Sequence, residues 1–179
     1  ATRLHHGFCG WLLEHTVSIL NLCRYYAAAY DFLSADLLYA AALYHDIGKT
    51  KELSAFPEND YTDDGQLLGH IVIGVEMLDE AIRAIPGFPP KLASELKHCI
   101  LSHHGELEYG SPKKPALAEA MALNLADNTD AKMETIKSFL AVYDNLERAV
   151  AACAGEDPDA PHRKGLEMIF HQFEEILTG

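Results

Sequence analysis

Apolar residues recur every three or four positions through most of the chain, and this spacing limits the fold more than any other feature. The segments 11–30 and 91–103 both carry the stripe that lets one face of an α-helix pack on a core. Alanine and leucine recur throughout, and no run rich in valine, isoleucine and threonine alternates as a half-buried β-strand does. The sequence therefore predicts an all-α protein.

Length and composition are those of one ordinary domain. The chain has 179 residues, of which 49% are hydrophobic and 23% are charged. This is enough apolar material to bury a real core. We therefore expect one domain over residues 1–179, in which each amphipathic helix packs on the same core.

Caps and helix breakers suggest where the helices begin and end. Ser34 is a typical N-cap, Gly48 is a plausible stop, and the proline-rich segment 85–90 must end a helix. Polar, turn-forming residues predict surface loops at 53–66 and 154–163. We expect helices from 11 to about 30, from 34 to 48, from 67 to the break at 85–90, from 91 to a break at Gly105, from about 120 to 152, and over 165–177.

Histidine and aspartate occupy positions within five of these apolar stripes. Any one of them could be an ordinary hydrogen-bonded core residue. Seven buried separately are implausible in a stable domain, because each unpaired group costs about 1–3 kcal/mol. A shared site with a pair of divalent cations would satisfy all of them. The residues are His15, His45, Asp46, His70, His103, His104 and Asp127.

The cysteines and the apolar runs indicate the compartment. Cys9, Cys23, Cys99 and Cys153 are far apart and form no C-x-x-C pair, so we expect reduced thiols. No apolar run reaches the roughly 20 residues of a membrane span, and no leader-like segment opens the chain. These features favour a cytoplasmic protein without a membrane partner.

The charge balance argues against one class of nucleic-acid binder. The formal net charge is −13, whereas a broad surface for phosphates normally needs lysine and arginine. Bound divalent cations would change this balance locally. If the chain acts on nucleic acid, its metals must therefore supply much of the attraction.

Five stretches resemble the HD-domain metal-dependent phosphohydrolases, and among them most closely the YhaM-type 3'-5' exoribonucleases. They are HHGFCGWLLEHT, LLYAAALYHDIGKTKEL, YTDDGQLLGHI, LSHHGELEYGSP and LADNTDAKM. The resemblance covers His5 to about Met133. It implies an HD-domain helical bundle with a metal site between the core helices. It also implies two divalent metal ions, manganese foremost, with iron, cobalt, nickel, zinc or magnesium as alternatives.

The resemblance also implies which residues bind the metals. The first ion would be held by His15, His45, Asp46 and Asp127, and Asp46 would bridge to the second. The second ion would be held by His70, His103 and His104. The split between the adjacent histidines stays open, because spacing alone does not separate them.

Further residues have weaker expected roles. Asp46 and Lys49 are the expected catalytic residues, with the Lys49 ammonium reaching a substrate phosphate, although a solvated lysine would need no explanation. His5 and His6 could contact substrate, and His6 is the one we retain as a candidate. Glu106 and Asp130 could orient histidines by contacting them without binding the metal themselves, or they could be capping or solvated carboxylates.

The implied activity is metal-assisted hydrolysis, in which an activated water attacks phosphorus at the 3' end of single-stranded RNA or DNA. The main alternative keeps the metals and changes the substrate to a nucleotide, a cyclic dinucleotide or another small phosphate ester. A di-iron oxygenase and a sensor or scaffold without turnover are further hypotheses. The related exoribonucleases carry an OB-fold domain ahead of the HD domain, so we expect this chain to be the C-terminal part of a longer protein. Assembly into a homo-oligomer stays open.

Overall fold

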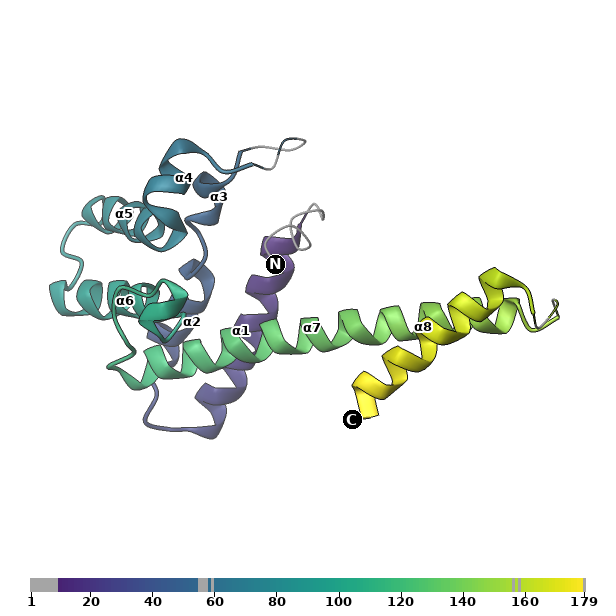
Figure 1. Cartoon of the computed structure of the whole chain (residues 1–179). Helices are drawn as coiled ribbons and strands as arrows, with labels where there is room; N and C mark the ends of the chain where they lie inside the picture. The colour runs from purple at the N-terminus through teal and green to yellow at the C-terminus, as the bar shows by residue number, and fades with distance from the viewer. Residues whose placement is uncertain (1–9, 55–57, 59, 156, 158, 179) are drawn as a thin grey trace. The chain divides into compact units, whose positions relative to one another are not determined.

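The structure is a computed structural model that describes residues 10–54, 58, 60–155, 157 and 159–178 (Figure 1). Within them the fold is all-α, as predicted, and the one β-type pairing is an isolated bridge between Leu53 and Tyr61. The α-helices are α1 (Trp11–Ala29), α2 (Ala35–Tyr44), α3 (Lys49–Glu52), α4 (Asp63–Leu67), α5 (Gly69–Arg83), α6 (Pro90–Ser102), α7 (Ala118–Ala152) and α8 (Pro161–Thr178), with a short 3-10 helix η1 (Leu107–Tyr109).

The chain divides into two compact units, residues 1–130 and 131–179, and α7 contributes to both. In the first unit, hereafter the body, α1 packs on α2, α2 on α6, and α5 on α3 and α6. Fully buried side chains from four helices meet in its core: Ile19, Cys23, Leu38, Ala41, Ala42, Cys99, Ile100, Ala120, Leu123 and Ala126.

Helix α2 ends earlier than the sequence suggested. It stops at Tyr44 rather than at Gly48, so His45 and Asp46 lie in the turn that follows. Gly48 has a different use, because a Cβ there would lie 1.9 Å from the His70 carbonyl oxygen. The missing side chain lets this turn approach α5 closely, which brings two of the predicted site segments together.

The cap of α2 and the loop 53–66 also differ from expectation. Ser34 precedes α2, but its side chain makes no capping hydrogen bond; its backbone N–H instead donates to Glu119 Oε1 at 2.7 Å. The predicted loop 53–66 contains the start of α4, where the Thr62 hydroxyl accepts from the Gly65 N–H at 2.9 Å. Leu67, assigned to the apolar stripe of the next helix, is 81% exposed at the end of α4. A helix of five residues is too short to show a helical period.

The second unit, hereafter the hairpin, pairs the end of α7 with α8. The ring centroids of Tyr143 and Phe170 lie 5.3 Å apart, and those of Phe139 and Phe173 lie 6.4 Å apart. Helix α8 begins at Pro161, before the predicted start at 165, because proline fits the first turn of a helix. The predicted loop 154–163 therefore extends too far, because its last residues already belong to α8. None of the described helices, in either unit, is long and apolar enough to cross a membrane.

Candidate metal centre

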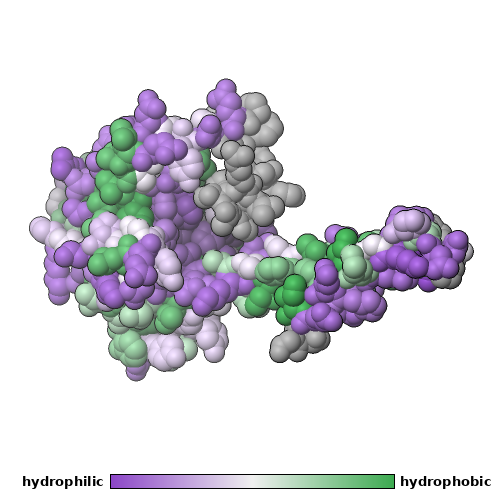
Figure 2. Space-filling view, in the orientation of Figure 1, coloured by the Kyte–Doolittle hydropathy of each residue, from purple (hydrophilic) through white to green (hydrophobic). Residues whose placement is uncertain are grey.

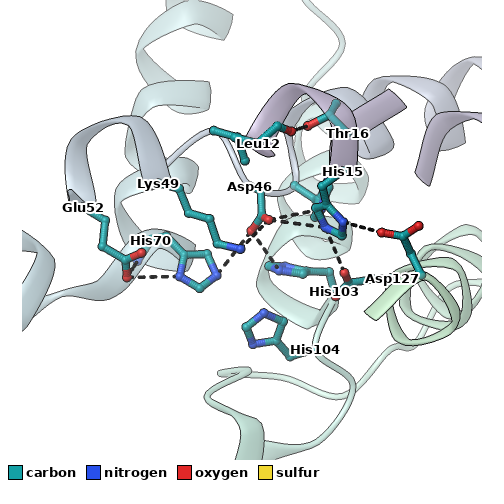
Figure 3. A network of polar contacts seen from close by, with 12 residues as sticks. Leu12, His15, Thr16, Asp46, Lys49, Glu52, His70, His103, His104 and Asp127 are labelled. Carbon is teal, nitrogen blue, oxygen red and sulfur yellow. Dashed lines mark hydrogen bonds and ion pairs between the residues drawn. The ribbon is translucent and has the colours of Figure 1, made fainter. Parts of the chain in front are cut away.

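The seven predicted ligands come together within the body, and Figure 3 labels all of them except His45. Each is carried by a helix or by the turn that ends one, so packing of the apolar stripes also fixes the polar residues between them. The positions are His15 on α1, His45 and Asp46 after α2, His70 on α5, His103 and His104 after α6, and Asp127 on α7.

Six of these residues form two groups. The ligand atoms of His15, His45 and Asp127 lie within 4.8 Å of one another. Those of a second group lie equally close together: His70, His103 and His104. This is the same division that the family resemblance implied.

Asp46 lies between the two groups and directs one oxygen to each. Its Oδ2 is 3.6 Å from His15 Nε2 and 3.5 Å from His45 Nε2. Its Oδ1 is 3.5 Å from His70 Nε2 and 3.7 Å from His103 Nε2. A carboxylate so placed is able to bridge two cations.

In all five histidines, the ring nitrogen Nδ1 contacts an oxygen acceptor of the protein. His15 Nδ1 contacts Asp130 Oδ2 at 2.8 Å, and His70 Nδ1 contacts Glu52 Oε1 at 3.2 Å. The other three contact backbone carbonyl oxygens: His45 that of Ala42 at 2.8 Å, His103 that of Ile100 at 2.7 Å, and His104 that of Tyr109 at 2.8 Å. Because an acceptor at Nδ1 draws the proton there, the Nε2 lone pair of a neutral ring is left to bind a metal. His15 Nε2 also contacts Asp127 Oδ1, at 3.2 Å.

Three polar atoms at the centre are buried without a hydrogen-bond partner: Asp46 Oδ1, His70 Nε2 and His103 Nε2. Burying an unsatisfied polar atom costs about 1–3 kcal/mol, so three in one place need an explanation. Imidazole nitrogen and carboxylate oxygen are ligands that manganese, iron, cobalt, nickel and zinc accept. The donor set therefore fits divalent metal ions.

The charge states of the central residues suit this chemistry. Burial opposes ionisation of Asp46, but nearby His45, Lys49 and His103 outweigh it and hold the pKa of the carboxyl well below its usual range. Burial, with His104 close by, lowers the pKa of His103 to about 3. At neutral pH this pair therefore consists of a carboxylate and a neutral imidazole, the forms that bind a cation.

His15 differs from His103. Burial would lower its pKa, but hydrogen bonds to Asp127 and Asp130 outweigh burial and raise the pKa above the usual value. Burial would raise the pKa of Asp127, and its contact with His15 more than offsets this, so that pKa is lowered. His15 therefore holds a proton more tightly than His103.

The remaining predicted residues are placed as follows. Lys49 Nζ lies 2.6 Å from Asp46 Oδ2. Asp130 contacts His15 Nδ1 and also accepts a hydrogen bond from the Ser18 hydroxyl. Glu106, for which both an orienting role and a solvated position were open, is exposed, and its carboxylate pairs with Lys114 at 2.6 Å. His5 and His6 lie outside the described residues.

Two contributors were not foreseen from the sequence. Glu52 is 8% exposed, and its Oε1 accepts from the His70 backbone N–H at 2.9 Å as well as contacting the ring. Asn124 Nδ2 donates to the His103 carbonyl oxygen at 2.8 Å and so holds the turn after α6. Glu52 stands at the edge of a polar loop, where no periodicity marks it as buried. Asn124 lies on the inward face of α7, and this position in the apolar stripe is the sequence signal that could have identified it.

Comparison with known proteins agrees with this geometry. The HD domain family matches residues 12–132, and residues 116–179 match the GrpE family. The chain is 47% identical over 144 residues to 3'-5' exoribonuclease YhaM of Bacillus subtilis, a match that covers 78% of this chain and 44% of that protein. It is 44% identical over 140 residues to the YhaM of Halalkalibacterium halodurans, covering 78% of this chain and 43% of that protein.

The chain spans less than half the length of the curated relatives it matches. No solved structure matches it. The GrpE match covers the smaller part of the chain, whereas the HD match takes in every residue of the two histidine groups and Asp46. The resemblance found in the sequence is confirmed: the chain belongs to the HD domain family.

Proposed function

We propose that this HD domain is the catalytic part of a manganese-dependent 3'-5' exonuclease that hydrolyses single-stranded RNA or DNA in the cytoplasm. The relatives' names supply the substrate class, because those proteins are called 3'-5' exoribonucleases. The identity of the native ion and its number, two per chain, are part of the proposal.

One observation supports the proposal most strongly: a buried carboxylate lies between two groups of imidazoles, and its Oδ1, like two imidazole nitrogens, has no hydrogen-bond partner. Divalent ions bound in such a site activate water and neutralise the charge of a phosphate. A purely structural polar cluster would be expected to satisfy its own hydrogen bonds. The candidate centre leaves its inward atoms available to ligands.

The chain's own residues would orient the ions and the substrate. Asp46 would bridge the ions through its two oxygens, which face different groups. Glu52 and Asp130 would fix the rings of His70 and His15 through their Nδ1 atoms. The Lys49 ammonium would contact a non-bridging phosphate oxygen and stabilise the charge that develops there.

A small phosphate ester is the alternative substrate, and the net charge of −13 favours it, since long polyanions are repelled by an acidic surface. A mononucleotide or cyclic dinucleotide would need no basic groove. The metal centre and the roles of Asp46 and Lys49 would be unchanged.

The test is digestion of a short, 5'-labelled single-stranded RNA with Mn²⁺, in parallel with a panel of small phosphate esters. Asp46→Asn keeps the shape of the side chain and removes the charge that binds the cations. His171→Gln is the matched control, because His171 lies exposed on the hairpin, where it pairs with Glu174.

We expect products that shorten from the 3' end with the unaltered chain and with His171→Gln, and none with Asp46→Asn. Intact RNA alongside a cleaved ester would establish the alternative. If Asp46→Asn stayed fully active, the bridging role would be wrong.

A further inference from the structure

The single tryptophan of the chain lies against the metal centre. Trp11 is the first residue of α1, one turn ahead of His15, and the two ring planes are parallel within 1° with centroids 5.5 Å apart. Residues four apart share one face of a helix, so α1 itself builds this stack. Trp11 thus covers a face of the imidazole whose Nδ1 is held by Asp130.

Trp11 has a second neighbour at the site, the Lys49 ammonium. Lys49 Nζ lies 5.1 Å from the centroid of the Trp11 ring and 2.6 Å from Asp46 Oδ2. The Lys49 side chain is only 19% exposed, so water screens these contacts little. An ammonium over an indole face is attracted by the electrons of the ring. Lys49 is therefore shared between a carboxylate and an aromatic face.

The two partners of Lys49 respond differently to a metal. Asp46 Oδ2, which Lys49 contacts, is also the oxygen that faces His15 and His45. A divalent cation held by that group would share this oxygen with the ammonium, and two cations so close repel strongly in a buried site. The indole face has no charge to be neutralised, so its attraction for the ammonium persists.

We propose that Trp11 is a positioning residue, whose ring retains the Lys49 ammonium beside the metal centre when a divalent cation takes over Asp46 Oδ2. Without this face, the displaced side chain would swing into solvent. With it, the ammonium stays where it can meet a substrate phosphate. The purpose of this arrangement rests on the proposed function, whereas the retention of Lys49 at the ring does not.

Fluorescence of the full chain tests the contact between Lys49 and the ring without any turnover, since all tryptophan emission comes from Trp11. The probe is Zn²⁺, which is diamagnetic, and Lys49→Met is the comparison, with zinc binding to both chains verified by calorimetry. We expect zinc to change the emission of the unaltered chain, and the change to be largely lost in Lys49→Met. An equal change in both chains, or none in the unaltered chain, would overturn the proposal.

A double-mutant cycle tests the consequence for catalysis at saturating metal. Trp11→Leu should lower kcat roughly 2- to 30-fold, the range expected for a lost cation–π contact, and Trp11→Phe should restore most of it. In the Lys49→Met background, Trp11→Leu should have no further effect. Additive losses would mean that Trp11 acts only by packing, which contradicts the proposal. If the unaltered chain hydrolyses no phosphate ester, the proposed function fails and the fluorescence comparison alone decides the role of Trp11.

Discussion

The body and the hairpin use apolar residues in opposite ways. In the body, α1, α2, α6 and α7 bury a common core, with residues such as Leu38 and Leu123 fully enclosed. In the hairpin, no residue whose burial is described is buried; Leu140 is 53% exposed and Ile176 is 78% exposed. Figure 2 shows hydrophobic residues on the surface of that unit.

This difference explains why the candidate metal centre lies in the body. Two groups of three side chains, each with its ligand atoms within 4.8 Å of one another, need packed helices that fix their backbones. The end of α7 and α8 contain no buried residue among those whose burial is described, so this unit lacks the packing that would hold side chains so closely. The HD match covers 12–132, and so ends close to the boundary between the two units at residue 130.

The largest expected effect compares one substitution at two places on the same helix. Leu123→Ala and Leu140→Ala both shorten a leucine of α7, but Leu123 is fully buried and Leu140 is exposed. Leu123→Ala leaves a cavity and should lower the free energy of unfolding by about 2–5 kcal/mol. Leu140→Ala should change it by less than about 1 kcal/mol. Urea denaturation measures both, and equal losses would mean that the hairpin is as well packed as the body.

A metal should stabilise the body and leave the hairpin unaffected. Binding to the folded chain alone adds about 2.7 kcal/mol at a concentration 100 times the Kd, so Mn²⁺ should raise the melting temperature. Asp46→Asn should abolish most of this shift, and His171→Gln should keep it. A shift of the same size in Asp46→Asn would place the metal elsewhere.

Glu52 allows a finer comparison of two carboxylates. It is buried and holds His70, whereas Glu167 on the hairpin pairs with Arg163. Residues that orient a metal-bound histidine typically change metal affinity 10- to 100-fold, so we expect a loss of about this size for Glu52→Gln. Glu167→Gln should leave the affinity unchanged. Titration calorimetry gives the two values, and an unchanged affinity in Glu52→Gln would remove the carboxylate from the site.

The cysteines show the same contrast between buried positions in the body and more exposed positions in the hairpin. Their expected effect on stability is smaller. Burial raises the pKa of Cys23 and Cys99 to about 12, whereas Cys153 is partly exposed at the end of α7. Because their folded-state pKa exceeds the unfolded value of about 8.5, these thiols stabilise the fold at neutral pH, and this contribution is lost as pH rises towards 12. At pH 8, in a Cys9→Ser chain, Cys153 should react rapidly with a thiol reagent while the other two react only on unfolding. Rapid reaction of all three would show that the body opens.

The clustered histidines and aspartates could be singled out because they interrupt long apolar stripes. His15 and Asp127 stand where a helical period demands a buried side chain, so the amino-acid sequence alone marks them as unusual. The start of α4, the role of Gly48 and the burial of Glu52 could not be predicted. These features depend on which segments approach one another, and a period along one helix carries no information about that.

The most direct test of the account is the number of ions that the body holds. After equilibrium dialysis against Mn²⁺, elemental analysis should find two ions per chain in the unaltered protein and in His171→Gln, and fewer than two in Asp46→Asn. Absence of bound metal in the unaltered chain, or an undiminished number in Asp46→Asn, would contradict the claim that Asp46 joins two metal sites.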